Sequence, residues 1–329
     1  MNKKKLSMGR SARQNIVLLV ILLALCIFFY TQSEKFLTMY NLMSMVRQNL
    51  PNLLLACSMM FVIASGAIDL SVGGMMGLSA IFFGYLCIWG VNPWLAIPIV
   101  LCLGVGVGVL NTVIMEKLKI PAIMATLATW IITAGLALAI CNAIPISGPE
   151  VKPITALNSI KFAGGIPLAL IIVVVVIAIF IFLEKKTLLG KYAIAIGGND
   201  SAAYYAGINV FRMRMIFFIL SGVMAAFSGI WQVGRIGSAD PTIGVGMEFS
   251  VIAAVILGGV NIKGGEGTIA GVVLGTLILM ILTNGMKMMN IDSFFQQVVT
   301  GIVLYVAVLV NSLGGNKKRI RRKVAVAKE

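Results

Sequence analysis

The sequence has 329 residues, of which 60% are hydrophobic and only 11% are charged, whereas a soluble globular protein carries roughly 25% charged residues. This composition excludes a soluble enzyme, a secreted disulfide-rich module and a disordered chain. The net charge of +15 would indicate nucleic-acid binding in a soluble protein, but the placement of the basic residues, described below, excludes that function.

Ten apolar segments follow one another along the chain, and most have the length of a membrane-spanning helix. These segments must be helical, because every backbone polar group in lipid needs a partner within the protein. We therefore predict an all-α integral membrane protein, a single polytopic domain over residues 1–329 with about ten transmembrane helices between residues 15 and 312. The segments are residues 15–31, 50–65, 71–89, 93–114, 121–143, 166–183, 215–233, 247–260, 268–285 and 294–312.

The distribution of Lys and Arg predicts the orientation of these segments, because positive residues concentrate in cytoplasmic loops. With the N-terminus inside, 20 of the 26 Lys and Arg residues fall on the cytoplasmic side and 6 on the outer side. Both termini are therefore expected in the cytoplasm, with residues 1–14 before the first span and residues 313–329 as a basic tail. The long loop 184–214 lies on the same side. The basic charge thus reflects membrane topology, and no nucleic-acid partner is expected.

Residues that could support catalysis or bind a cofactor are scarce. The chain has no histidine, which removes the commonest metal ligand and general base. A G-x-x-x-x-G-K-[ST] phosphate-binding loop is absent: Gly190 and Lys191 are followed by Tyr192, and Lys185 stands where the first glycine belongs. We expect no catalytic residues, no metal site and no cofactor bound by this chain.

Ionisable side chains beside the apolar segments are candidates for function, because placing a charge in lipid costs about 2.5–3.5 kcal/mol or more. Asp69 lies at an expected break before the span at 71, where it either caps the following helix or takes part in gating. Ser71 begins the same span. Glu248 begins another, and a structural or a functional role is open for it. The centres of the spans hold almost no charge, which argues against proton-coupled and, less strongly, sodium-coupled transport.

Polar uncharged residues are spread over several segments without a common stripe, which argues against a passive channel. They are Asn111, Thr126, Thr129, Asn142, Gln232, Asn284, Gln296 and Gln297.

Glycines four residues apart predict close contacts between helices. They are Gly73 and Gly77, Gly104 and Gly108, and Gly271 and Gly275. Residues 65–74 and 258–265 also share a pattern, in which a span ends at small residues, a polar turn follows and a glycine-containing span begins. This similarity indicates a weak internal repeat, as transporters often have.

The cytosolic loop 184–214 contains the signals of a short helix. Asn199 after Gly198 is a favourable N-terminal cap, Asp200 complements the helix dipole, and Gly207 would end a helix of about two turns. A short helix of small residues, held outside the membrane between basic residues, is suited to dock on a partner protein. An ordinary surface helix is the alternative.

Three motifs resemble the permease subunits of ABC importers for ribose, galactose, xylose and related sugars. SGAIDLSVGG at residues 65–74 resembles the family's signature after the second span, and GGNDSAAYYAGIN at residues 197–209 is similar to its cytosolic coupling loop. The third motif lies at residues 234–267, with GRIGSADPT, IAAVILGG and GGEG. Two residues depart from the family pattern: Ser250 stands where an aspartate is common, and Ala67 where a glycine is frequent.

The resemblance implies a type II-like ABC importer permease in the inner membrane of a bacterium. Two permease chains, identical or paralogous, would form the path for a sugar, and separate ATP-binding subunits, which bind ATP and Mg²⁺, would drive alternating access. An extracytoplasmic sugar-binding protein would deliver the sugar to residues 144–165 and 234–246. An ion-coupled secondary transporter of a small polar solute is the alternative.

The resemblance and the residue pattern together nominate two sets of site residues. The coupling set, expected to act with the ATP-binding subunit, is Gly197, Gly198, Asn199, Ala202, Ala203 and Gly207. The pathway or gating set is Asp69, Ser71 and Glu248.

Overall fold

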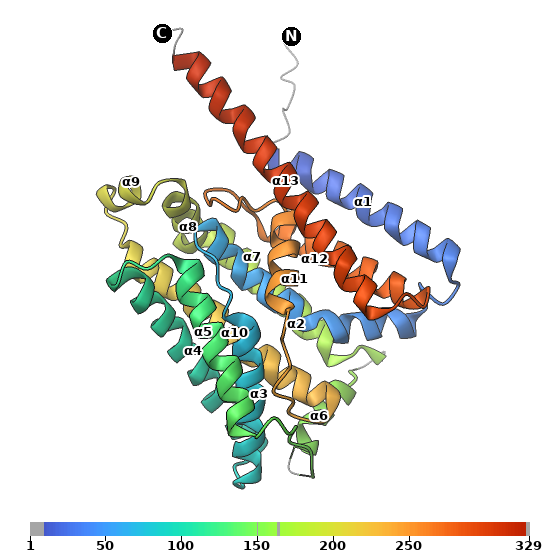
Figure 1. Ribbon diagram of the computed structural model, residues 1–329. Coiled ribbons are helices and arrows are strands. Elements are labelled where there is room, and N and C mark those ends of the chain that lie inside the picture. Colours follow the sequence, from blue (N-terminus) through green and yellow to red (C-terminus); the bar gives the residue numbers. More distant parts are fainter. Residues whose placement is uncertain (1–9, 150, 163–164, 327–329) are drawn as a thin grey trace.

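The computed structural model describes residues 10–149, 151–162 and 165–326, and over these ranges it consists of thirteen helices (Figure 1). Extended structure in these ranges is confined to two isolated bridges, Ile146–Ala239 and Lys161–Pro167. The all-α prediction is therefore confirmed for the described chain. The helices are α1 Arg10–Gln32, α2 Met39–Ala64, α3 Val72–Ile88, α4 Pro93–Lys117, α5 Ala122–Ile140, α6 Lys152–Ser159, α7 Leu168–Lys186, α8 Leu188–Gly198, α9 Asp200–Tyr205, α10 Val210–Ile236, α11 Met247–Leu257, α12 Ile269–Met288 and α13 Ser293–Val326.

Each of the ten apolar segments falls on one of these helices. Seven of the helices, α1, α2, α4, α5, α7, α10 and α12, are long and apolar enough to cross a membrane. The apolar parts of α3, α11 and α13 have at most 17 residues, fewer than the approximately 20 of a typical span. The structure therefore supports a multi-pass membrane protein, while the count of about ten spans stays a prediction.

The second helix begins earlier than the sequence predicts, at Met39 instead of near residue 50. Thr38 marks its start, because its Oγ1 accepts a hydrogen bond from the backbone N of Asn41 at 3.4 Å. The stretch between Met39 and Asn49 contains several polar residues, which lower its hydropathy and conceal it from a search for apolar segments. These polar side chains contact neighbouring helices and a cavity described below.

The last helix extends further than predicted, because α13 continues to Val326 and makes most of the expected tail 313–329 helical. Residues 1–9 of the expected cytosolic N-terminus and residues 327–329 of the tail lie outside the described residues. The start of α1, the end of α13 and the short helix α9 lie toward one end of the molecule, and α6 lies toward the other (Figure 1).

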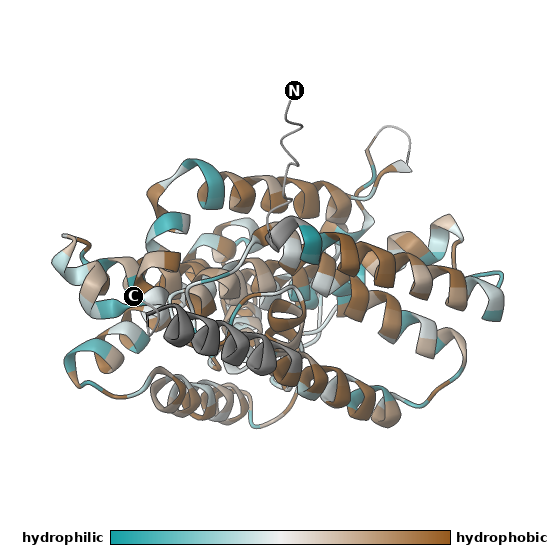
Figure 2. Cartoon of the chain, turned by 90° about the horizontal axis from the view of Figure 1, so that it is seen from above, coloured by the Kyte–Doolittle hydropathy of each residue, from teal (hydrophilic) through white to brown (hydrophobic). Residues whose placement is uncertain are grey.

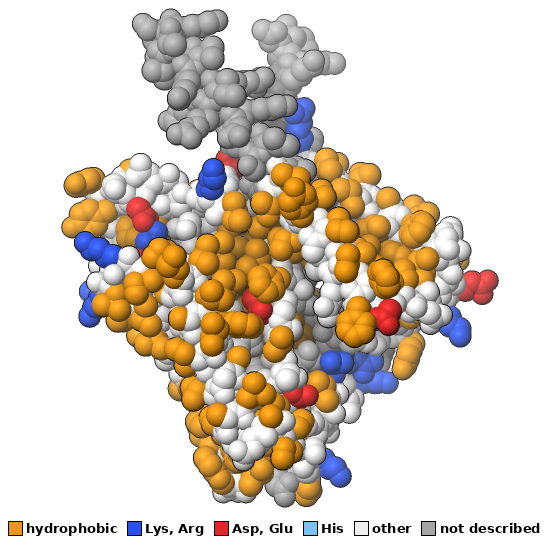
Figure 3. Space-filling view, in the orientation of Figure 1, with side chains coloured by type: hydrophobic (Ala, Val, Ile, Leu, Met, Phe, Trp, Pro, Cys, Tyr) orange, Lys and Arg blue, Asp and Glu red, His pale blue; other side chains and the backbone are white. Residues whose placement is uncertain are grey.

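The centre of the fold is formed by α2, α3 and α11, whose residues are mostly buried, and by α10, whose most apolar stretch is 61% buried. Of the most apolar stretch of α2, 72% is buried, compared with 11% for α1 and α7. Apolar residues also run along the peripheral helices (Figure 2) and are spread over much of the face seen in Figure 3. Helices that are apolar on both their inner and outer faces are typical of a protein surrounded by lipid.

Glycines bring α4 and α10 into direct backbone contact. A Cβ placed on Gly104 would lie 2.5 Å from the carbonyl oxygen of Gly222, and one on Gly108 would lie 2.5 Å from that of Phe218. Because no side chain other than hydrogen fits at these distances, the predicted close approach of helices is confirmed here.

Replacing Gly104 with leucine is therefore expected to destabilise the protein by about 1–3 kcal/mol, the usual cost of overfilling a packed core. The thermal unfolding midpoint in detergent should fall by several degrees. Gly106→Leu on the same helix is the matched control, because a Cβ at Gly106 would meet none of the described atoms within 4 Å. Equal midpoints for the two variants would contradict the proposed α4–α10 packing.

Candidate functional site

A polar cavity of about 870 Å³ lies between α2, α10, α11, α12 and α13. Seven of the side chains that line it carry amides, four carry hydroxyl groups and two are cationic. Among the described residues, no carboxylate lines it. The amides belong to Gln48, Asn49, Asn52, Gln232, Asn284, Gln296 and Gln297, the hydroxyl groups to Ser250, Thr283, Ser293 and Thr300, and the charges to Arg235 and Lys287. Such a lining offers many hydrogen bonds to a polyhydroxylated solute.

The cavity corrects the prediction that the polar residues are scattered. Gln232, Asn284, Gln296 and Gln297 lie on three different helices, yet all four line the same cavity. The sequence of one segment does not reveal this arrangement, because the lining is assembled from five helices that are far apart along the chain. The first part of α2, which sequence analysis left outside the span, supplies Gln48 and Asn49.

Hydrogen bonds fix the amides around the cavity. Asn41 and Asn284 exchange two side-chain hydrogen bonds of 2.9 and 3.1 Å, which join α2 to α12. Asn49 donates through Nδ2 to the carbonyl oxygen of Met45 at 3.0 Å. The Oδ1 atom of Asn52 is buried and has no hydrogen-bond partner within the described part of the chain. Since a buried polar atom normally has a partner, Asn52 is available to a donor in the cavity.

Asp69 and Ser71 lie in a separate, buried network between α3, α4 and α5. Asp69 Oδ1 accepts hydrogen bonds from the backbone N of Ser71, at 2.9 Å, and from its hydroxyl group. Asn111 donates to Ser71 Oγ at 2.9 Å and accepts from Thr129 Oγ1 at 2.6 Å. This geometry is that of a side chain that stabilises the turn before α3. Neither residue lines the cavity, and a gating role for them stays a prediction.

Glu248 lies in the first turn of α11, with 2% of its surface exposed. Its side chain faces α3, where a Cβ on Gly73 would meet the carboxylate. The Oε2 atom has no hydrogen-bond partner within the described part of the chain. The next residues, Phe249 and Ser250, line the cavity instead. The first turn of α11 therefore places an acidic residue behind the cavity wall.

The two segments that resemble each other in sequence, residues 65–74 and 258–265, meet in space. The backbone N of Gly265 donates to the carbonyl oxygen of Ala64 at 2.9 Å. A Cβ on Gly264 would lie 2.7 Å from Gly197 Cα and 2.8 Å from the backbone N of Gly66. We call the contact of Gly66, Gly197, Gly264 and Gly265 the glycine junction. It joins the end of α8 to the loops that follow α2 and α11.

The expected cytosolic loop is more helical than predicted, because α8 precedes the expected short helix α9. Asn199 caps α9, since its Oδ1 accepts a hydrogen bond from the backbone N of Ala202 at 2.9 Å. Gly207, with φ +85°, follows the end of that helix. The predicted start and end of the helix are confirmed, and its length is six residues.

The structure divides the expected coupling residues into two groups. Gly198, Asn199, Ala202 and Gly207 are exposed, whereas Ala203 is buried and Gly197 belongs to the glycine junction. Exposed aromatic residues, which sequence analysis did not single out, lie beside the first group: Tyr204 is 67% exposed and Tyr205 is 87% exposed. The exposed surface of α9 thus combines small residues with two aromatic rings.

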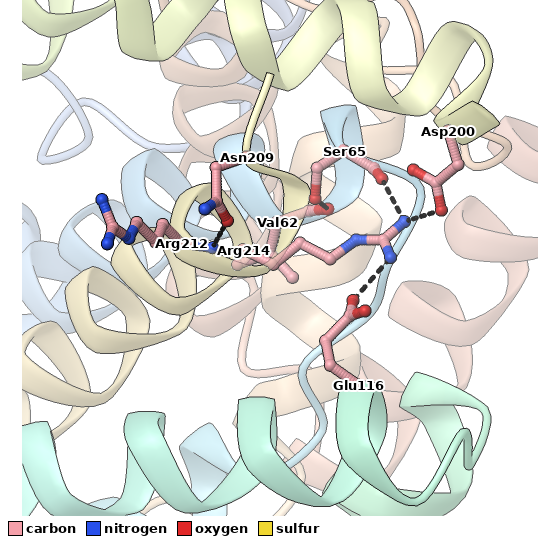
Figure 4. A network of polar contacts seen from close by, with 7 residues as sticks. All are labelled: Val62, Ser65, Glu116, Asp200, Asn209, Arg212 and Arg214. Atoms are coloured by element: carbon pink, nitrogen blue, oxygen red, sulfur yellow. Dashed lines mark hydrogen bonds and ion pairs between the residues drawn. The ribbon is translucent and has the colours of Figure 1, made fainter. Parts of the chain in front are cut away.

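An arginine that sequence analysis counted only for topology connects α9 to the helices below it (Figure 4). Arg214, in the second turn of α10, forms ion pairs of 2.6 Å with Glu116 at the end of α4 and with Asp200 at the start of α9. Its Nη2 atom also donates to the carbonyl oxygen of Ser65, the residue that ends α2, at 3.4 Å. One side chain therefore contacts three elements.

The two expected outer loops, residues 144–165 and 234–246, contact each other. Ile146 and Ala239 exchange two backbone hydrogen bonds of 2.8 Å, and Ser238 Oγ donates to Ile146 O at 3.2 Å. The described parts of these loops lie toward the end of the molecule opposite α9 (Figure 1).

A polar cavity between apolar helices, together with an exposed capped helix outside them, defines a multi-pass membrane transport protein. The model of a protein family described as "Branched-chain amino acid transport system / permease component" matches residues 41–308. The chain belongs to this family of permeases, whose members are transport components and not enzymes.

Its relatives include sugar permeases. The ribose import permease protein RbsC of Escherichia coli (strain K12) is 34% identical over 303 residues, which cover 92% of this chain and 93% of that protein. RbsC of Bacillus subtilis (strain 168) is 37% identical over 279 residues, with coverage of 85% and 87%. The L-arabinose transport system permease protein AraH of Escherichia coli (strain K12) is 35% identical over 319 residues, 96% of each chain. The resemblance to permeases of sugar ABC importers is therefore confirmed. No solved structure gives a significant match.

Proposed function

We propose that this chain is the membrane subunit of an ATP-binding cassette importer that moves a monosaccharide, of the ribose, galactose or xylose kind, into the cytoplasm. The observation that carries this proposal is α9, a six-residue helix that Asn199 caps and that exposes most of its surface. Such a helix is suited to receive force from a separate ATP-binding subunit, which binds ATP and Mg²⁺ while this chain binds no cofactor. Two relatives are named for the import of ribose and of L-arabinose, which supports a sugar as the substrate.

The cavity supports the same proposal, because its amides and hydroxyl groups suit the hydroxyl groups of a sugar. A second permease chain, identical or paralogous, completes the path by which the sugar crosses the membrane. An extracytoplasmic sugar-binding protein docks on the surface formed by the loops 144–165 and 234–246. In this arrangement about ten spans cross the inner membrane of a bacterium, and both termini are cytoplasmic. ATP binding then favours one of two conformations through its differential affinity for them.

Co-purification tests the central element of this proposal. The tagged chain, extracted from its native membranes in mild detergent, is expected to bring an ATP-binding subunit with it. Asn199→Arg should abolish that association, because it removes the cap of α9 and adds a long charged side chain to the docking surface. Mass spectrometry of the purified complex is the measurement.

Asn92→Arg is the matched control. Asn92 is also exposed, and it caps α4 in the same way, accepting from the backbone N of Trp94 at 2.9 Å, but far from α9. The Asn92→Arg variant should leave the ATP-binding subunit bound. A chain that purifies alone and transports sugar in liposomes under an ion gradient without ATP would instead establish the alternative, an ion-coupled secondary transporter.

A further inference from the structure

We propose that Arg214 is a positioning residue that transmits movements of α9 to the ends of α2 and α4. The proposal rests on the proposed function, because α9 must be the place where the ATP-binding subunit acts. Figure 4 shows the guanidinium group between the carboxylates of Glu116 and Asp200, with the carbonyl oxygen of Ser65 on the same side. No other side chain in this view contacts all three elements.

The chemistry of arginine suits this role. A guanidinium group is planar and holds its N–H donors in a fixed arrangement, so it binds two carboxylates in a defined geometry. Nη1 contacts Glu116 and Nη2 contacts Asp200, each at 2.6 Å. Only 14% of the Arg214 side chain is exposed, compared with 49% of Asp200. The network is therefore anchored inside the protein and reaches the surface at α9.

The helix α9 is short and has little buried surface. It has six residues, of which only Ala203 is buried, and a turn at Ala206 and Gly207 follows it. A helix so short has little stability of its own, so its position depends on its contacts with the rest of the chain. The Asp200–Arg214 ion pair, at 2.6 Å, ties it to α10.

The elements that Arg214 connects are those that a conformational change would move. Ser65 precedes the glycine junction at Gly66, and Glu116 ends α4, which packs closely on α10 through Gly104 and Gly108. A displacement of α9 would therefore pull on α2 and α4 together, through the side chain of Arg214. Coupling between sites requires such a continuous physical connection or an equivalent two-state element.

Arg212 provides an internal control on the same helix. Positions two residues apart on an α-helix differ by about 200° in direction, and Figure 4 shows Arg212 pointing away from Glu116 and Asp200. Within the described chain, Arg212 makes no ion pair, although its backbone N bonds to the cap Asn209 at 3.0 Å. A substitution at either arginine removes one positive charge, but only the one at Arg214 breaks the network.

The test compares Arg214→Gln, Arg212→Gln and Asp200→Asn in the complete transporter reconstituted into liposomes. We expect Arg214→Gln to retain the ATP-binding subunit and hydrolyse ATP, while the sugar imported per ATP hydrolysed falls by about tenfold, within the range of coupling between protein sites. Asp200→Asn should lower this ratio as well, because it removes the ion pair between Arg214 and α9 while the Arg214–Glu116 pair stays in place. Arg214→Lys should restore part of the sugar imported per ATP hydrolysed. Its ammonium group keeps the positive charge but lacks the planar arrangement of N–H donors that binds two carboxylates.

The outcomes separate this inference from the proposed function. If the unmodified chain brings no ATP-binding subunit with it, the proposed function fails and the role of Arg214 fails with it. If Arg214→Gln loses the subunit, Arg214 only shapes the docking surface, and transmission is overturned. If Arg214→Gln and Arg212→Gln import the same amount of sugar per ATP hydrolysed, transmission by Arg214 is overturned as well. Should Arg214→Gln not fold, Asp200→Asn decides alone, because it removes one exposed contact and leaves the Arg214–Glu116 pair in place.

Discussion

Replacing Gly197 with valine is expected to abolish sugar uptake by opening the glycine junction, whereas Gly198→Ala should leave uptake nearly unchanged. A Cβ at position 197 would overlap the carbonyl oxygen of Ala64 and lie 2.6 Å from the backbone N of Gly265. Both are backbone atoms, which cannot turn aside as a side chain can. A Cβ on Gly198 would meet none of the described atoms within 4 Å.

Overfilling such a contact costs about 1–3 kcal/mol, and the cost falls on the contact that joins α8 to the loops after α2 and α11. Gly197→Val should therefore lower the thermal unfolding midpoint and displace α9, which reduces the amount of ATP-binding subunit that co-purifies. Gly198→Trp should keep the midpoint of the unmodified protein and yet prevent docking, because the indole would project from the exposed surface. Similar midpoints for Gly197→Val and Gly198→Ala would show that the junction is not tightly packed.

These two neighbouring glycines also show what could and could not be predicted from the sequence alone. Sequence analysis placed Gly197 and Gly198 in one coupling set, because a motif assigns residues by their order along the chain. Only the fold brings Ala64 and Gly265, residues from distant parts of the sequence, against Gly197. The cap at Asn199 and the end near Gly207 were predictable, since they depend on local hydrogen bonding and backbone conformation.

The same distinction between local signals and contacts across the chain explains which features of the fold could be predicted. Apolar segments and their glycine pairs are local signals, and each predicted segment falls on a helix. The start of α2 at Met39 was not predictable from hydropathy, because its first three turns carry polar residues that contact other helices and the cavity. The Asn41–Asn284 pair illustrates why: each amide is costly in an apolar helix taken alone, and the cost is offset only when α2 and α12 come together.

The ion pairs of Arg214 were missed for a related reason. Sequence analysis used Lys and Arg as topology markers and gave Arg212 and Arg214 the same meaning. The two arginines differ in their ion pairs, because the helix directs their side chains to different sides and because the fold places Glu116 of α4 beside Arg214. A helical projection of residues 210–214 would have shown that the two arginines face different directions, but not what lies opposite each of them.

Filling the cavity is the second change from which we expect a complete loss of uptake. Ser250 lies on α11 and lines the cavity together with Asn49, Asn52 and Thr283. Ser250→Trp would place an indole among the amides and occupy space that a sugar needs. The helices around Ser250 are not overfilled, because the cavity of about 870 Å³ has room for the ring. The unfolding midpoint and the bound ATP-binding subunit should therefore stay unchanged.

Ser250→Ala and Ser250→Asp distinguish the role of space from that of chemistry. Ser250→Ala removes one hydroxyl group among many hydrogen-bonding groups, worth about 0.5–1.5 kcal/mol, so uptake should fall by no more than about tenfold. Ser250→Asp introduces the residue common in the sugar permeases that this chain resembles, into a cavity that Arg235 and Lys287 also line, and should preserve uptake. Uptake of radiolabelled sugar into cells measures all three variants. Normal uptake by Ser250→Trp would place the path elsewhere in the molecule, because a side chain of that size cannot share the cavity with a sugar at the same position.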